Sequence, residues 1–289
     1  MSKSANHHYF EYASITDALN KCLEPLPDYQ GDCKASKKDT SDKHSWSLDC
    51  HSFEDALGLA NNGYKDAGKV FLEKLEACSL VVERKDIVRY WDTAGEEIDI
   101  DRFLNGEPEN MRAMRFSASR RKRKTPTTEI IVDRFASCGI GADTIKRHGL
   151  FVLSLVRALQ DQGHSVGVTV AFCGEGSNTG QDTCTIAVRV KQPDQYIDPD
   201  MLGFWLVHPA AFRRIGFRLI EHLPEKIGQD FGAYHYYFSP GKLPIHLTKD
   251  KIYFDNVSLN RASNWKTDQD VQDAVKKELI ERGLINKDS

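Results

Sequence analysis

HSVGVTVAFCGEGSNTGQDTCTIAVRVK, residues 164–191, contains two apolar segments, and the ten residues 173–182 between them favour a loop. The segments 165–172 and 184–190 have the composition of β-strands. Parallel strands need a long crossover connection, usually a helix, and this loop has no helical pattern. The two strands are therefore predicted to pair antiparallel, and we expect 184–190 to lie at an edge of the sheet.

The sequence on either side of this pair alternates between strands and helices. A short buried strand at 129–133 precedes a helix at 143–163, and a long helical stretch interrupted at Pro209 follows the pair. A strand at 251–257 and an amphipathic helix from 267 complete the order. The inner side of the first of these helices is predicted to consist of Ile145, Leu150, Leu153, Leu155 and Leu159. Right-handed crossovers place this order in an α/β, Rossmann-like three-layer sandwich.

Three regions are predicted along the chain. Residues 1–110 form a helical and irregular N-terminal region, 111–127 a basic connector, and 128–289 the α/β domain. Helices in the first region should break at Asn61–Gly63, and a strand–turn or small hairpin should surround Thr93–Gly95. Side chains typical of N-caps mark the predicted helix starts at Ser14, Ser52, Asp101, Asp143 and Thr267.

The strand pair and the strand–helix order resemble the von Willebrand factor A-type domain, whose third strand is an antiparallel edge. In that family the loop after the first strand reads D-x-S-x-S and ligates a divalent cation. The corresponding residues here run from Asp133 to Ser137, but Phe135 replaces the middle serine and Arg134 adds a positive charge. Hard cations need several oxygen ligands, so we expect a degenerate loop that binds no metal. The alternative is a metal site at Asp133, of a hydrolase or adhesion type.

Composition restricts the class of protein. The chain has 289 residues, a formal net charge of −3 and 40% hydrophobic residues, which suffices for a core. Its start, MSKSANHHYF, has no apolar stretch fit for a signal peptide, and no later run approaches a membrane span. Seven cysteines are scattered without a C-x-x-C pair, which is typical of reduced thiols. We expect a cytoplasmic protein that does not contact membranes.

Four further segments carry a second resemblance: SFEDALGLANNGYKD, DIDRFLNGEPENM, RHGLFVLSLVRALQDQGHSV and FWLVHPAAFRRIGFR. Together they resemble an uncharacterised family of phage and plasmid proteins, over roughly Ser52–Val257, with LNGEPENM as the most specific part. The resemblance implies a phage or mobile-element origin, hence the cytoplasm of a host cell, and a metal-degenerate A-type fold. It implies no reaction.

The sequence offers no catalytic constellation. His148, His208, His222 and His235 have no recognisable nucleophile or orienting partner beside them, and each is interpreted as a core or surface residue. Asp99 and Asp101 are as typical of a turn and a helix cap as of paired catalytic carboxylates. Gly139 and Gly141 lack the spacing of a dinucleotide-binding loop. We therefore predict no catalytic residue and no cofactor.

A basic run gives the strongest local signal. Seven basic residues and no acidic ones lie between positions 112 and 124: Arg112, Arg115, Arg120, Arg121, Lys122, Arg123 and Lys124. Clustered cations bind phosphates without reading base sequence. Tyr234 and Tyr236, in the segment AYHYYF, could stack on the bases of a single strand. The prediction is a non-enzymatic protein that contacts single-stranded DNA or RNA and recruits phage transcription or replication machinery.

The alternatives remain open at this point. The basic run is equally typical of a solvated linker, and strand tyrosines are common in cores. The chain would then be a protein–protein adaptor with a phage or host protein as its partner. Ionic strength distinguishes the two, because phosphate binding weakens steeply with salt and an apolar interface need not.

Overall fold

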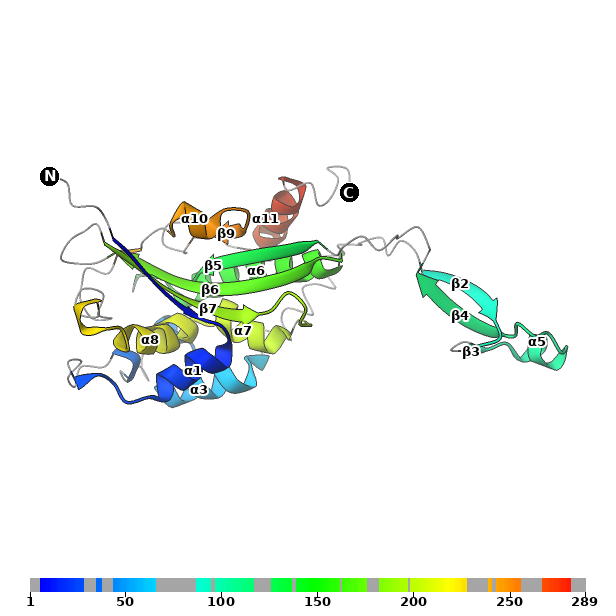
Figure 1. Cartoon of the computed structure of the whole chain (residues 1–289), viewed down its shortest axis with the longest axis horizontal. Helices are drawn as coiled ribbons and strands as arrows, with labels where there is room; N and C mark the ends of the chain where they lie inside the picture. The colour runs from blue at the N-terminus through cyan, green and yellow to red at the C-terminus, as the bar shows by residue number, and fades with distance from the viewer. Residues whose placement is uncertain are drawn as a thin grey trace.

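The structure is a computed structural model, and most of its secondary structure lies in one mixed six-stranded sheet with helices packed against it (Figure 1). The order along the sheet is β1-β7-β6-β5-β9, and β8 pairs with the far end of β6. The strands are β1 (His7–Tyr12), β5 (Thr127–Asp133), β6 (Ser165–Glu175), β7 (Thr183–Lys191), β8 (Ser239–Pro240) and β9 (Ile252–Phe254). The structure describes residues 6–28, 35–37, 44–65, 87–94, 97–116, 126–136, 139–161, 163–175, 182–196, 198–227, 239–240, 243–255 and 267–281. The α/β class is confirmed, and the sheet is Rossmann-like at most.

The antiparallel pairing of β6 with β7 is confirmed, with Ala171 opposite Ala187. The prediction that this second strand forms an edge is wrong. Strand β1 pairs parallel with β7 along its whole length, from His7 opposite Thr183 to Tyr12 opposite Val188. The segment HHYFEY alone does not predict this pairing, because the partner strand lies about 176 positions further along the chain. A strand from the region 1–110 thus belongs to the same sheet as residues 128–289.

Helix α6 (Ala142–Asp161) connects β5 to the parallel neighbour β6. Its predicted inner side is confirmed, since all five predicted side chains are buried. Gly163 follows the helix with φ of 86°, and the amides of Gly163 and His164 bond to carbonyls of its last turn. Asp143 lies in the first turn instead of capping it, because the helix already begins at Ala142.

Helix α7 (Pro199–Val207) packs along α6 and is capped by Asp198, whose carboxylate accepts from the amides of Asp200 and Met201. The predicted break at Pro209 is confirmed. Beyond it lie the π-helix η3 (Ala211–Gly216) and α8 (Phe217–Glu221), and all six residues of η3 are buried.

Short N-terminal helices lie below the sheet in Figure 1, beside α7 and α8. They are α1 (Ile15–Leu23), η2 (Ala35–Lys37), α2 (His44–Ser47) and α3 (Phe53–Asn62). Ser14 caps α1 and Ser52 caps α3 as predicted, the latter in a capping box with Asp55. Gly63, with φ of 81°, ends α3 at the predicted break.

The opposite face of the sheet carries a smaller apolar cluster of Ile131, Ala171, Cys173 and Leu243, with Leu247 and Tyr253 packed against it. Leu247 belongs to α10 (Ile245–Thr248). The chain's last described helix is α11 (Asp268–Glu281), and the Thr267 hydroxyl caps it by accepting from the amide of Asp270. Among the helices that the structure describes, none is long and apolar enough to cross a membrane.

A separate small unit comprises the antiparallel sheet β2 (Ile87–Asp92), β4 (Met111–Phe116) and β3 (Glu97–Ile98), together with α5 (Ile100–Leu104) (Figure 1). A hairpin of β2 and β3 around Thr93–Gly95 is excluded, because β2 and β3 each pair with β4 and not with each other. Asp99, not Asp101, caps α5 by accepting from the amide of Arg102. The end of this unit that carries β3 and α5 is called the tip below, residues 97–110.

Candidate functional site

Asp133, the first residue of the predicted metal loop, is fully buried at the end of β5. Its Oδ1 accepts from the amide of Phe135 at 3.0 Å and from the amide of Cys173 at 3.3 Å. The carboxylate therefore connects its own loop to the neighbouring strand. Phe135, at the position of the family's middle serine, packs its ring 5.0 Å from that of Phe212. Ser137 lies outside the described residues.

Arg134 turns inward instead of towards solvent. Its guanidinium donates to Nδ1 of His148 at 3.2 Å and to the carbonyl oxygen of Ile145 at 3.5 Å. Because arginine has only donors, this contact requires Nδ1 of His148 to be an acceptor. Burial, with the nearby Arg134 cation, lowers the pKa of His148 from 6.5 to about 3, and burial lowers the pKa of Arg134 to about 9. The pair is thus an arginine cation beside a neutral histidine. In the described part of the chain, no three His, Cys, Asp or Glu side chains gather as metal ligands.

This pair predicts a stability that depends on pH. The unfolded chain protonates His148 below about pH 6.5, whereas the folded chain does so only near its lowered pKa. Stability contributed here is therefore present above pH 6.5 and lost as pH falls towards 3. At pH 5 the loss should be about 2 kcal/mol. The free energy of unfolding is measured in urea at pH 7 and at pH 5. Between these pH values His148→Gln should lose about 2 kcal/mol less than the parent loses. Equal losses in both proteins would contradict the assignment.

His208 is also committed to packing. Its Nδ1 accepts from the amide of Ala210 at 3.1 Å, so the proton lies on Nε2, which contacts Asp49 at 3.0 Å. Its ring lies at 4.8 Å from that of Tyr64 and 5.9 Å from that of Phe204. Neither ring nitrogen is thus available to take a proton from a substrate. His235 lies outside the described residues.

Three buried arginines of η3 and α8 bond to the N-terminal segments, and we call them the arginine clamp: Arg213, Arg214 and Arg218. Arg213 donates to the carbonyl oxygens of Trp46 and Ile140. Arg214 donates to the carbonyl of Ser36 at 3.0 Å and to that of His51 at 2.6 Å. Arg218 donates to the carbonyl of Cys22 at 2.9 Å and to that of Glu24 at 3.2 Å. The six acceptors come from four described stretches of chain: 6–28, 35–37, 44–65 and 139–161.

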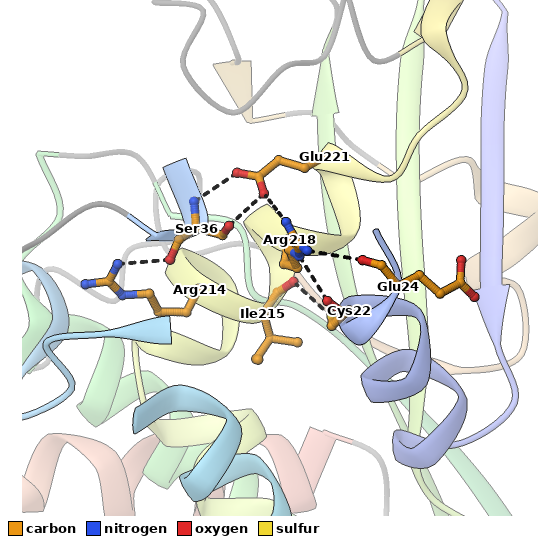
Figure 2. Close-up of polar contacts among 7 residues, drawn as sticks. All are labelled: Cys22, Glu24, Ser36, Arg214, Ile215, Arg218 and Glu221. Carbon is orange, nitrogen blue, oxygen red and sulfur yellow. Dashed lines mark hydrogen bonds and ion pairs between the residues drawn. The ribbon is translucent and has the colours of Figure 1, made fainter. Parts of the chain in front are cut away.

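Glu221 extends the clamp, as Figure 2 shows. Its carboxylate accepts from the amide of Ser36 at 2.9 Å and from the hydroxyl of Ser36 at 2.6 Å, and lies 3.5 Å from Arg218. The Trp46 ring lies against Arg213 and Arg214 at 5.6 and 5.1 Å. The segment FWLVHPAAFRRIGFR thus secures the N-terminal region to the main core. Sequence reasoning missed this role, although three arginines in an otherwise apolar helical stretch are a signal for it.

Side-chain contacts around Trp91 stabilise the small unit. The guanidinium carbons of Arg102 and Arg112 lie 4.5 and 5.3 Å from the centre of its ring. Arg102 also pairs with Glu107 at 2.6 Å, and Arg112 with Glu97 at 3.2 Å. Cation–π contacts and ion pairs together hold α5 and β3 to the other two strands.

Arg112 is thus the one predicted nucleic-acid ligand whose side chain the structure describes, and it is already paired. Arg115 is described only as a backbone position in β4, opposite Val88. These two positions do not test the predicted site, which stays a prediction. The remaining ones lie outside the described residues: Arg120, Arg121, Lys122, Arg123, Lys124, Tyr234 and Tyr236.

The tip exposes large apolar side chains. Ile98, Ile100, Phe103 and Leu104 are 47%, 66%, 56% and 74% exposed. Soluble proteins often expose single apolar residues, but a contiguous group typically marks an interaction surface. These four belong to the seven-residue stretch 98–104, and all but Ile98 lie in the segment DIDRFLNGEPENM. Sequence reasoning interpreted this stretch as a helical turn and overlooked the surface.

The chain belongs to the family described as Domain of unknown function (DUF7192), whose model matches residues 2–285. No curated protein and no solved structure matches the chain. The match covers nearly the whole chain, the small unit included. The match therefore includes the region 1–110 as well as the α/β domain.

Proposed function

We propose that this chain is a non-enzymatic adaptor that binds another protein through the tip of its small unit. The observation that carries the proposal is the group of four exposed apolar side chains on β3 and α5. Full burial of one large apolar side chain contributes about 1.5–3 kcal/mol. Two or three of them buried in a partner would supply the central contacts that dominate protein interfaces.

The rest of the structure supports a scaffold role. Several of the described buried polar groups are engaged with the fold itself: Asp133 with its loop, His208 with Asp49 and Ala210, and the arginine clamp with main-chain carbonyls. The tip, by contrast, is fixed by Trp91 and its two arginines while its apolar residues face solvent. A rigid support with an exposed apolar surface favours binding because little ordering entropy is lost.

The test is affinity capture with matched variants. The parent, the double variant Phe103→Ser/Leu104→Ser and the control Tyr196→Ser are each used to capture proteins from nuclease-treated host extract. Tyr196 is 97% exposed in the main body, so its replacement alters a comparable surface side chain away from the tip. We expect one protein to be captured by the parent and the control, with affinity reduced about 30-fold in the double variant, which corresponds to about 2 kcal/mol. Capture that is equal in all three would contradict the proposal.

A second candidate, binding of single-stranded DNA or RNA, is favoured by the charge of residues 112–124, which include seven basic and no acidic residues. Such binding would be lost on nuclease treatment, would ignore the tip variant, and would weaken steeply with salt. From the resemblance to phage and plasmid proteins we also propose that the partner belongs to transcription or replication machinery. The α/β domain of this chain would then serve as a metal-free, A-type scaffold. Replacing all five residues from Arg120 to Lys124 by Ser or Gln separates the two candidates, because this variant lacks most of the basic run but keeps the tip. It should lose binding to nucleic acid and keep binding to the partner protein.

A further inference from the structure

The apolar group of the tip lies in a segment that carries more acidic than basic side chains. Residues 97–112 include five acidic side chains and two basic ones. Asp101 and Glu109 are exposed, and so is Glu97, the first residue of β3. The four exposed apolar side chains thus share a short segment with an excess of carboxylates. An interface with one sign of charge at its rim selects partners of the opposite sign.

The two basic side chains do not offset this excess towards a partner. Arg102 pairs with Glu107 at 2.6 Å and Arg112 with Glu97 at 3.2 Å, and both guanidinium groups also lie against the Trp91 ring. Within the described residues, Asp101 and Glu109 form no ion pair. The charges left to face a partner are therefore negative.

We propose that the tip binds a basic segment with one apolar face, such as an amphipathic helix whose apolar stripe is flanked by lysine or arginine. This inference rests on the proposed function and specifies its partner. The apolar stripe would cover Ile100, Phe103 and Leu104, and the flanking cations would lie against Asp101 and Glu109. Helices in grooves and on apolar surfaces are recognised in this way, through apolar anchors at helical spacing.

Other occupants of the tip are disfavoured by the same charges. A phosphate backbone would be repelled by the carboxylates. Two copies of the chain joined tip to tip would place like charges together, which is costly across an interface. Nucleic acid and self-association are therefore outcomes that would count against the inference.

The experiment uses a displayed library of random 16-residue peptides selected against the full-length chain. Selection is followed by binding of the enriched peptides to the parent, to Phe103→Ser/Leu104→Ser, and to Asp101→Asn/Glu109→Gln. We expect enriched peptides that combine apolar residues at helical spacing with an excess of Lys and Arg. Their affinity should fall about 30-fold in the apolar variant. In the charge variant it should fall about fivefold, and this loss should disappear in high salt.

The outcomes separate the two proposals. Enriched peptides that need Phe103 and Leu104 but carry no excess of basic residues would overturn the basic partner and leave the adaptor standing. Peptides that bind all variants equally would overturn both. Self-association of the parent in light scattering, abolished by the apolar variant, would identify a second copy as the occupant and overturn the inference.

Discussion

Gly149→Ala should destabilise the protein by about 3 kcal/mol or more, although alanine is the better helix former by about 1 kcal/mol. Gly149 lies inside α6, where that helix approaches α7. A Cβ at this position would lie 1.9 Å from the carbonyl oxygen of Leu206 and 2.5 Å from Cα of Val207. These are backbone atoms, so no side-chain rotation relieves the overlap and the two helices must separate. Urea unfolding of the purified variant measures the loss.

Gly58→Ala is the matched control. Gly58 is also inside a helix, α3, and a Cβ there would meet nothing within 4 Å. That variant should be more stable than the parent by about 0.5–1 kcal/mol. If the two glycine variants shift stability in the same direction and by similar amounts, the close packing of α6 on α7 is wrong.

Arg214→Met should cost about 3 kcal/mol of stability. The arginine is fully buried and donates to the carbonyls of Ser36 and His51. Methionine retains the apolar stem but leaves these acceptors without their donor, and an orphaned buried acceptor costs about 1–3 kcal/mol. The loss should be accompanied by faster proteolysis of the N-terminal segments, because the clamp secures them.

Lys277→Met serves as the control for Arg214→Met. Lys277 pairs with Glu281 at 3.7 Å on the surface of α11, and exposed pairs contribute little. Its unfolding midpoint should match that of the parent. An Arg214→Met variant that is equally unaffected would show that the clamp does not secure the N-terminal region.

Local signals predicted much of the fold. The caps at Ser14, Ser52 and Thr267 and the stop at Gly163 depend on residues only a few positions away, and the structure has each of them. The antiparallel pair at 164–191 followed from a loop that has no helical pattern. Such features are encoded within one turn or one connection, which a single sequence displays.

Features that depend on distant partners were missed. Strand β1 joins the sheet only by pairing with β7, which lies far along the chain. The arginine clamp binds main-chain carbonyl oxygens, and no pattern of side chains in the sequence identifies these acceptors. The cap of α5 was placed two residues late, because Asp99 and Asp101 are equally good cap residues by type.

The candidate site shows the same division. Sequence favoured the basic run, because charge is visible in composition. The tip was overlooked since apolar residues in a short turn are ordinarily assigned to a core. In the part of the chain that the structure describes, no further layer covers α5. Phe103 and Leu104 are exposed for this reason, which the sequence alone does not reveal.

Photo-crosslinking from the tip tests the central claim most directly. A benzophenone amino acid is placed at position 104 in one protein and at position 196 in another, and both are irradiated in a nuclease-treated extract of the source cells. Adaptor function through the tip predicts one covalent adduct with a distinct protein from position 104, absent from position 196 and lost when Phe103→Ser is added. No adduct from position 104, or the same adducts from both positions, would contradict the claim that the tip binds a partner protein.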